Sequence, residues 1–160
     1  MAKEVKTNVM RMLEKAQIPY AAHFYEHEDG AIDGVSVAQK LGQPKECVYK
    51  TLVTRGADKN YYIFVIPVEF ELNLKAAAKA VGVKSVEMIP VADINRVTGY
   101  IRGGCSPVGM KKQYRTVLHK DCIQNKTIIV SGGKIGTQVE LEPDRLIQFI
   151  GASTADLVEQ

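Results

Sequence analysis

The stretch GYIRGGCSPVG, residues 99–109, holds the features that decide the fold and, we expect, the functional site. It begins with apolar residues typical of a strand, passes through the pair Gly103 and Gly104, and closes on Ser106 and Pro107. Two adjacent glycines leave the main chain bare, so a ligand can lie against backbone N–H groups. A second interpretation stays open, in which a bulged strand leads into a type I or II turn with Pro107 at its second position.

Length and composition predict one domain spanning residues 1–160, because a chain of this length with 46% hydrophobic residues can bury a substantial core. No apolar run approaches the roughly 20 residues that cross a bilayer, so we expect no membrane association. The cysteines Cys47, Cys105 and Cys122 are widely spaced and form no C-x-x-C pair, which favours a cytoplasmic location. A net charge of +3 permits contact with RNA without requiring it.

The periodicity of apolar residues predicts short helices interspersed among many strands. Helices are expected at 5–16, 37–41, 74–81, 90–97 and 142–150, and strands at 20–25, 47–54, 61–67, 86–88, 115–119, 126–130 and 139–141. Ser36 begins a capping box with Gln39, and Asn73 is an expected N-cap. Strands 47–54 and 61–67 indicate an antiparallel hairpin whose apolar second strand is central. The pattern predicts a mixed α/β fold of the α+β type, with a curled, largely antiparallel mixed sheet or partial barrel surrounded by short helices.

Nucleotide-binding patterns are absent. A phosphate-binding loop of the form G-x-x-x-x-G-K-[ST] fails because Met110 stands where the lysine is required. Neither glycine-rich segment, at 99–109 or 131–136, contains the dinucleotide pattern G-x-G-x-x-G. The sequence therefore predicts no cofactor.

Two catalytic arrangements are also disfavoured. On an extended strand His23 and His27 would lie about 13 Å apart, at ~3.3 Å per residue, so we expect no metal site. A serine–histidine–aspartate triad can be assembled from Ser106, His119 and Asp121, but no nucleophile elbow surrounds the serine. We therefore expect neither metal-assisted nor triad chemistry.

Lys50 is the side chain that strand alternation singles out. Val48, Lys50 and Leu52 fall on one face, so apolar neighbours flank the lysine. Such a lysine either lies at a sheet edge, where it deters strand pairing, or projects into a cavity, where it can bind a phosphate, a carboxylate or a polarised carbonyl. Tyr25 is equally compatible with a core position, and Ser131 with a turn whose N–H groups its hydroxyl satisfies. The residues alone leave these alternatives open.

Four ordered motifs carry a resemblance to the YbaK/EbsC family. They are VYKTL at 48–52, LNLKAA at 72–77, GYIRGGCSPVG at 99–109 and VSGGKIG at 130–136. The resemblance covers essentially the whole chain, and four motifs in this order are more specific than any one of them. The family is related to the editing domain inserted in bacterial prolyl-tRNA synthetases. It implies a curled mixed sheet with surrounding helices, in agreement with the expectation from periodicity.

The resemblance implies a deacylase that clears cysteine mistakenly attached to tRNA(Pro), by cutting the ester at the 3′-terminal adenosine. Lys50 would hold the terminal phosphate or the aminoacyl oxygens, and the N–H groups of Gly103 and Gly104 would face the aminoacyl carbonyl. The substrate thiol would attack its own ester and leave as a cyclic thiolactone, a step that needs positioning more than acid–base groups. The further substrate-binding positions that the resemblance implies are Tyr25, Thr51 and Ser131.

The segment 29–34 departs from relatives, some of which carry a pocket aromatic there, whereas this chain has Ile32 and Asp33. The wall of the pocket and the amino-acid preference are therefore left open, and Cys105 is interpreted as a small filler. Two rival functions remain: an editing hydrolase that uses water on another mischarged tRNA such as Ala-tRNA(Pro), and a non-catalytic module that binds tRNA or a synthetase. The expected partners are the 3′ end of mischarged tRNA(Pro) and prolyl-tRNA synthetase, since the modest charge predicts a weak grip on tRNA.

Overall fold

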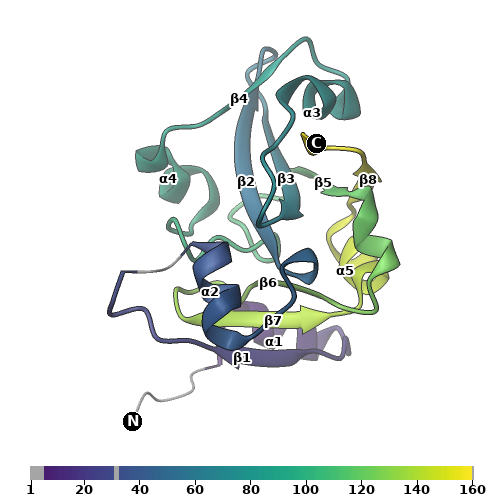
Figure 1. Ribbon diagram of the computed structural model, residues 1–160. Helices are drawn as coiled ribbons and strands as arrows, with labels where there is room; N and C mark the ends of the chain where they lie inside the picture. The colour runs from purple at the N-terminus through teal and green to yellow at the C-terminus, as the bar shows by residue number, and fades with distance from the viewer. Residues whose placement is uncertain (1–5, 31–32, 160) are drawn as a thin grey trace.

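Two β-sheets with short helices around them make up the protein. The computed structural model describes residues 6–30 and 33–159, so the expectations placed on Val5 and Ile32 lie outside the described residues. Within those ranges the chain forms eight strands, five α-helices and three 3-10 helices. Figure 1 shows the smaller sheet at the base of the molecule, with its strands running across the direction of the larger sheet. The expected mixed α/β class is confirmed.

The larger sheet is mixed and has the order β4-β2-β3-β5-β8. Its strands are β2 (Tyr49–Gly56), β3 (Tyr61–Pro67), β4 (Val86–Met88), β5 (Arg115–His119) and β8 (Ser153–Ala155). β2 and β3 form the expected antiparallel hairpin, in which Lys50 pairs with Ile66, and β3 is central as predicted. β5 and β8 join in parallel. β8 was not expected, because three residues with no buried member give no apolar signal.

The smaller sheet is antiparallel and has the order β1-β7-β6. Its strands are β1 (Ala21–Phe24), β6 (Ile128–Ser131) and β7 (Thr137–Leu141). A parallel bridge between Val48 and Ile129 joins it to the chain just before β2. In the register of β6 and β7, Ser131 lies opposite Gln138. The bridge and this register bring the start of β2 close to the end of β6.

Two helices cover opposite faces of the smaller sheet (Figure 1). The helices are α1 (Asn8–Lys15), α2 (Gly34–Leu41), α3 (Leu74–Val81), α4 (Ile94–Thr98) and α5 (Pro143–Ile150), with 3-10 turns at Lys45–Cys47, Val91–Asp93 and Lys120–Gln124. Leu13 of α1 packs in one buried cluster with Val130, whereas Ala38 of α2 packs in another with Ile129. Because alternate residues of a strand point to opposite faces, α2 lies over the face that carries Ile129 and Ser131.

One of the two predicted helix N-caps is confirmed, and the other is wrong. Asn73 caps α3 as predicted, and its side chain accepts a hydrogen bond from the Ala76 N–H at 3.0 Å. The N-cap of α2 is Asp33, not Ser36, and it accepts from the Ser36 N–H at 3.1 Å. The helix therefore begins at Gly34, three residues earlier than expected. Aspartate caps as well as serine does, and the earlier cap adds most of a turn.

One hydrophobic core joins the two sheets. Its fully buried members come from α1, both sheets and α5, and include Leu13, Ile63, Val65, Leu118, Ile128, Val139 and Leu146. Such a shared core couples the position of β2 to that of the smaller sheet. Within residues 6–30 and 33–159, none of the helices combines the length and the apolar character needed to span a membrane.

Candidate functional site

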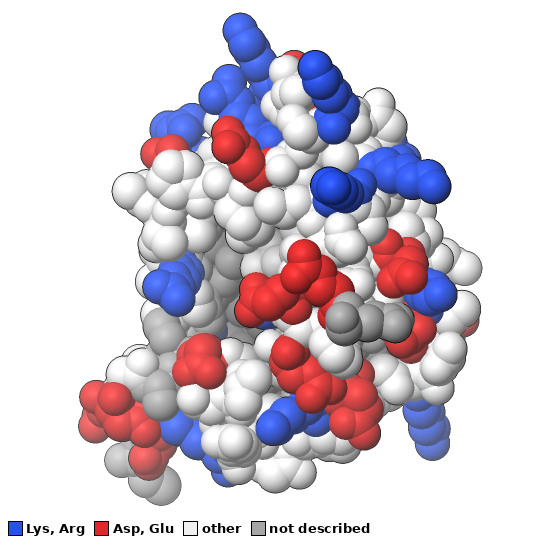
Figure 2. Space-filling model, turned by 45° about the horizontal axis from the view of Figure 1, so that its top comes forward, with Lys and Arg blue, Asp and Glu red and all other residues white. Residues whose placement is uncertain are grey.

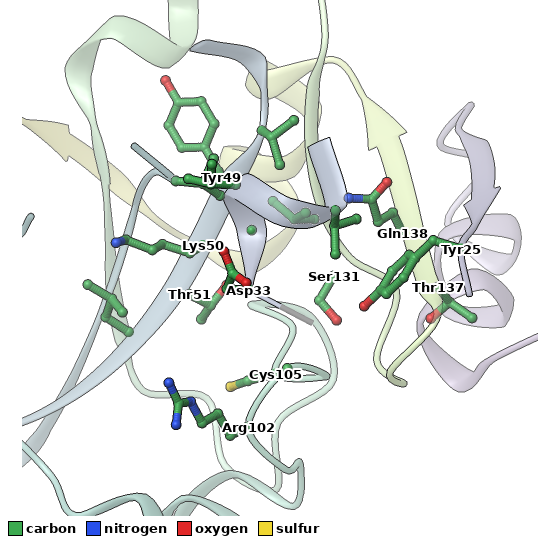
Figure 3. Close-up of a pocket in the computed structure, with 18 of the residues that line it drawn as sticks. Tyr25, Asp33, Tyr49, Lys50, Thr51, Arg102, Cys105, Ser131, Thr137 and Gln138 are labelled. Carbon is green, nitrogen blue, oxygen red and sulfur yellow. The ribbon is translucent and has the colours of Figure 1, made fainter. Parts of the chain in front are cut away.

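A cavity of about 650 Å³ lies between the start of β2, the N-terminal end of α2, the end of β6, the start of β7 and the loop at 102–105 (Figure 3). The described residues that line it are Tyr25, Gly30, Asp33, Gly34, Val35, Val37, Val48, Tyr49, Lys50, Thr51, Leu52, Val68, Arg102, Gly103, Cys105, Val130, Ser131, Thr137 and Gln138. Apolar side chains form one part of this wall, and hydroxyl, amide and charged groups form the rest.

Most of the residues expected at the site meet at this cavity. The lining includes Tyr25, Lys50, Thr51, Gly103 and Ser131, which come from four segments far apart in the sequence. Gly104 is buried behind the loop and does not line the cavity. Sequence spacing alone could not establish this meeting, since it depends on how the two sheets cross.

Lys50 projects from β2 into the cavity, together with its same-face neighbours Val48 and Leu52. Its side chain is half-buried, and none of the described acidic residues forms an ion pair with it. The next residue, Thr51, has a buried hydroxyl oxygen that finds no hydrogen-bond partner among the described residues. An unpaired cation and an unsatisfied hydroxyl in one cavity are groups that a polar ligand can satisfy.

The glycine-rich stretch forms a loop, so the expectation of a strand at its start is wrong. Gly99 ends α4 in the left-handed conformation, with φ of 87°, and the chain then makes a turn at Arg102 and Gly103. Gly103 also has a φ of 87°, which a residue with a Cβ adopts only under strain. The early C-cap is the reason that the apolar residues 100–101 do not continue into a strand. The Gly103 N–H has no backbone acceptor among the described residues.

Gly104 is placed by close packing. Its N–H donates to the Ile101 carbonyl at 2.9 Å, within the turn. A Cβ at this position would lie 2.9 Å from the Ile135 nitrogen and 3.2 Å from the Lys134 carbonyl carbon. Because those are backbone atoms of the second glycine-rich loop, Gly104 sets how closely the two loops approach. In this conformation its N–H is engaged and is not directed at the cavity.

Neutral hydrogen-bonding groups form the wall contributed by the smaller sheet. Ser131 accepts from the Gly133 N–H at 3.2 Å, which leaves its O–H available as a donor. Gln138 is only 6% exposed, and its side-chain oxygen accepts from the Gln43 amide nitrogen at 2.8 Å. In Figure 3 the Tyr25 side chain points toward Ser131. This wall presents mainly donors, which suit the oxygens of an ester, a ribose or a phosphate.

Two charged residues at the cavity were not predicted as site residues. Arg102 immediately precedes the glycine pair, and that adjacency was the available signal. Asp33 is the N-cap of α2, and hydrogen bonds from the Ser36 side chain and N–H hold the pKa of its carboxyl below the ordinary value. Gln138 was missed too, because its place follows only from the register with Ser131. All three depend on the tertiary arrangement.

Cys105 lines the cavity but is a poor nucleophile. Burial raises the pKa of its thiol to about 11, so nearly all of it is protonated at neutral pH. The interaction with the Thr98 side chain lowers this pKa only in part. The position agrees with the expected role of a small filler, and the cavity gains no thiolate from it.

The residues considered for a triad have local structural roles. Ser106 is fully buried, and its oxygen accepts from the Val108 N–H at 3.2 Å. His119 accepts from the Leu157 N–H at Nδ1, and its Nε2 lies 3.3 Å from Asp121. These contacts stabilise the glycine-rich loop and the C-terminal segment respectively. None of the three residues lines the cavity.

The two histidines near β1, His23 and His27, contact different residues. His23 bonds Glu140 across β1 and β7, with 2.8 Å between Nε2 and Oε1. His27 instead lies against Gly136, where a Cβ would be 2.9 Å from its ring. Among residues 6–30 and 33–159, no three or more metal-ligating side chains gather closely enough to hold an ion.

The surface around the site carries both signs of charge. Figure 2 shows a face that is hollowed near its centre, with aspartates and glutamates to the right of the hollow and below it, and lysines and arginines to its left and above it. The net charge of the chain is +3. A mixed surface of this kind gives weak electrostatic attraction to a polyanion, because opposite charges largely cancel at a distance.

Comparison with known proteins finds a matching family model and a similar protein of nearly the same length. The model of the aminoacyl-tRNA editing domain family matches residues 31–149, which contain every lining residue except Tyr25 and Gly30. The Enterococcus faecalis protein named "Putative Cys-tRNA(Pro)/Cys-tRNA(Cys) deacylase EbsC" is 44% identical over 152 residues, which cover 95% of this chain and 93% of that protein. The likeness therefore extends over nearly the full length of both chains.

Two solved structures share the fold. One is described as "a putative trans-editing enzyme for prolyl tRNA synthetase", with a TM-score of 0.80 and 22% identity, covering 98% of this chain and 100% of that one. The other is the hypothetical protein APE2540, with a TM-score of 0.86 and 22% identity, covering 94% and 99%. At this identity the likeness supports the fold alone, and it agrees with the expected architecture.

Proposed function

The chain belongs to the aminoacyl-tRNA editing domain family, and on that premise we propose that it is a trans-editing deacylase acting on Cys-tRNA(Pro). The observation that carries the proposal is the cavity in which Lys50, Gly103, Tyr25 and Ser131 meet. The relative that is 44% identical is named for Cys-tRNA(Pro) and Cys-tRNA(Cys) deacylation, which supports cysteine as the amino acid removed. The protein would act where tRNA is charged, in the cytoplasm.

Lys50 would bind the phosphate or the aminoacyl oxygens of the tRNA 3′ end. An ammonium is a compact charge with three donors, and no acidic side chain of the described residues pairs with Lys50 in competition with a ligand. The Thr51 hydroxyl, which is buried and unsatisfied, would hydrogen-bond the same group. Tyr25 and Ser131 would hold the ribose and the ester from the opposite wall.

The Gly103 N–H would donate to the ester carbonyl oxygen as negative charge develops on it. This donor has no backbone acceptor among the described residues and lies on a loop that lines the cavity. Gly104, first expected to supply a second N–H, would contribute by packing against the loop at 131–136, since its own N–H is bonded to Ile101. The Gly103 N–H and the Lys50 ammonium would then stabilise the oxyanion.

The nucleophile would be the thiol of the substrate cysteine. Its sulfur forms a bond to the carbonyl carbon, the ester C–O bond breaks, and the thiol proton ends on the 3′-oxygen of the released tRNA. Among the described lining residues of the cavity there is no histidine, and the Cys105 thiol is protonated, so neither a histidine base nor a protein thiolate is at hand. Intramolecular attack can gain several kcal/mol from proximity, so a site that positions the ester is sufficient.

Prolyl-tRNA synthetase would deliver the substrate. The mixed surface charge and the net charge of +3 give a weak grip on tRNA alone, and a weak grip favours delivery by a partner that already holds it. A pull-down at low salt tests this association directly. Absence of any complex under those conditions would contradict delivery without affecting the proposed chemistry.

The test of the function is deacylation of three esters on the same tRNA(Pro), carrying cysteine, serine or alanine. Serine has a hydroxyl in place of the cysteine thiol, and alanine has neither a thiol nor a hydroxyl. We expect rapid loss of cysteine alone, with a thiolactone as the trapped product. Hydrolysis of the alanyl ester would indicate attack by water and the alternative substrate. No loss of any ester, with tRNA still bound, would indicate a binding module.

A further inference from the structure

We propose that Asp33 recognises the free α-ammonium group of the aminoacyl ester and so restricts the site to substrates with an unblocked amino group. This inference rests on the proposed deacylase function and concerns a residue that the sequence marked only as a departure from relatives. It predicts that N-acylated and peptidyl esters are excluded by the same cavity.

The charges of the cavity point to this role. Among the described residues that line the cavity, Lys50 and Arg102 are cations and Asp33 is the single acid. No ion pair joins Asp33 to either cation within the described part of the chain. In Figure 3 the carboxylate lies between the Lys50 and Ser131 side chains. Its negative charge is therefore directed into the space that a ligand would fill.

The chemistry of an aminoacyl ester matches this arrangement. Phosphates, ribose oxygens and the ester carbonyl accept hydrogen bonds, and the donors and cations of the cavity suit them. The α-ammonium is the one part of the ester that carries positive charge and only donates. An α-amino group has a pKa of roughly 7.7–8.0 in peptides, so an amine of this class is protonated below neutral pH. It requires an acceptor, and an anionic one binds it best.

Two neutral acceptors of the cavity, the side-chain oxygens of Ser131 and Gln138, each already accept one hydrogen bond. The Ser131 oxygen accepts from Gly133 and the Gln138 oxygen accepts from Gln43. Among the described residues, the bonds that the Asp33 carboxylate accepts come from Ser36 and from its own backbone N–H, and a carboxylate has about four lone-pair sites. Asp33 therefore keeps both its charge and unused acceptor capacity on the cavity side.

The position of the carboxylate is fixed by the helix that it caps. The backbone of Asp33 is extended, with φ of −68° and ψ of 152°, and its side chain accepts from the first turn of α2. The following residue must be small, because a Cβ on Gly34 would lie 2.2 Å from Val68. The bonds to the first turn of α2 and the packing of Gly34 against Val68 keep the Asp33 carboxylate in one place. Recognition of a small group requires such a fixed acceptor.

The structural role and the binding role can be separated by substitution. Asp33→Asn and Asp33→Ser both retain a strong N-cap but lose the charge. Glu28→Gln is the matched control, because it removes a charge from the same segment at an exposed position outside the cavity lining. The midpoint of thermal unfolding should be similar in the wild type and in these three variants.

The test compares Cys-tRNA(Pro) with its N-acetyl form at pH 6.5. We expect the wild type and Glu28→Gln to prefer the free amine. Both Asp33 variants should lose about 10- to 100-fold in kcat/KM on the free amine and little on the acetylated ester, so the preference collapses. In the wild type KM should rise as pH passes the pKa of the substrate amine, and the Asp33 variants should lack this rise. Equal losses on both esters, or a preference that survives in Asp33→Asn, would overturn the proposal.

A binding measurement keeps this inference distinct from the proposed function. The probe is 3′-deoxy-3′-(cysteinylamino)adenosine, in which an amide replaces the ester, with its N-acetyl form as the comparison. Affinity for the free amine should fall about tenfold or more in Asp33→Asn, and affinity for the acetylated probe should not change. If the wild type cleaves no ester yet shows this pattern, the deacylase function fails and the recognition stands. If loss of the Asp33 charge does not change affinity for the free-amine probe, recognition of the ammonium by Asp33 is contradicted, whether or not the protein cleaves esters.

Discussion

The Tyr100 hydroxyl donates to the Val108 carbonyl at 2.5 Å and so ties the two ends of the glycine-rich loop together. The same ring packs against the second glycine-rich loop, because a Cβ on Gly133 would lie 3.4 Å from it and 2.8 Å from Val9 of α1. A Cβ on Gly109 would lie 2.8 Å from the Tyr100 oxygen, so this glycine too is required by the close approach of Tyr100. Tyr100 thus holds both loops at a fixed distance, with α1 behind them.

Tyr100→Phe should lower both stability and activity. Loss of the hydroxyl leaves the Val108 carbonyl without this donor, at a cost of about 1–2 kcal/mol in the free energy of unfolding. Burial raises the pKa of Tyr100 to about 12, so the hydroxyl donates throughout the neutral range and the effect should not change with pH there. Urea unfolding and deacylation assays measure both effects. Tyr20→Phe, which removes a bond to Glu14 at the surface, is the control and should cost less. Equal costs for the two variants would contradict the role of Tyr100.

Gly104→Ala should impair the site more than it impairs the fold. The added Cβ meets backbone atoms of the second loop at 2.9 Å, and these can yield only if the two loops separate. We expect kcat/KM to fall at least about tenfold. Gly82→Ala is the matched control, since its φ is 73° with open space around it, and it should lose about 1–2 kcal/mol of stability without losing activity. Full activity of Gly104→Ala would show that loop spacing is unimportant.

Cys105→Ala should retain deacylation within about threefold of the wild type. A thiol with a pKa of about 11 is roughly 0.1% thiolate at pH 8, so it does not supply the nucleophile. Alkylation of Cys105 by iodoacetamide should accelerate as the pH rises toward 11, because the raised pKa delays formation of the thiolate. Rapid alkylation at pH 7, or loss of turnover in the alanine variant, would indicate a reactive cysteine instead.

Turnover should depend on salt less steeply than in strongly basic RNA-binding proteins. A net charge of +3, with both signs mixed on the face in Figure 2, implies few phosphate contacts, and the slope of log kcat/KM against log salt reflects their number. We expect a shallow slope of about −2 or less in magnitude for the protein alone. Addition of prolyl-tRNA synthetase should lower KM. A steep slope without the synthetase would indicate a larger tRNA interface than proposed.

Local signals predicted most of the fold. Asn73 with its helix and the hairpin of β2 and β3 follow from capping residues and apolar alternation, and both are confirmed. The capping box at Ser36 was wrong because Asp33 caps the helix first. The strand expected near Tyr100 was wrong because Gly99 ends α4 in the left-handed conformation. Each error concerns a choice between two local signals of similar strength.

The site was less predictable, since its geometry depends on tertiary contacts. Alternation placed Lys50 on a face with apolar neighbours but could not distinguish a sheet edge from a cavity. The bridge between Val48 and Ile129 creates that cavity by joining segments about 80 residues apart, and no local pattern encodes such a bridge. The family resemblance supplied the candidate roles. The structure added Asp33 and the packing of Gly104.

The most direct test of the account is deacylation of Cys-tRNA(Pro) by the wild type, Lys50→Ala and Arg55→Ala. Arg55 is the matched control, because it lies on the same strand, is exposed and does not line the cavity. The account predicts rapid loss of the cysteinyl ester with the wild type and Arg55→Ala, and a rate at least about 100-fold lower with Lys50→Ala. Equal rates for all three proteins would contradict the placement of the 3′ end against Lys50.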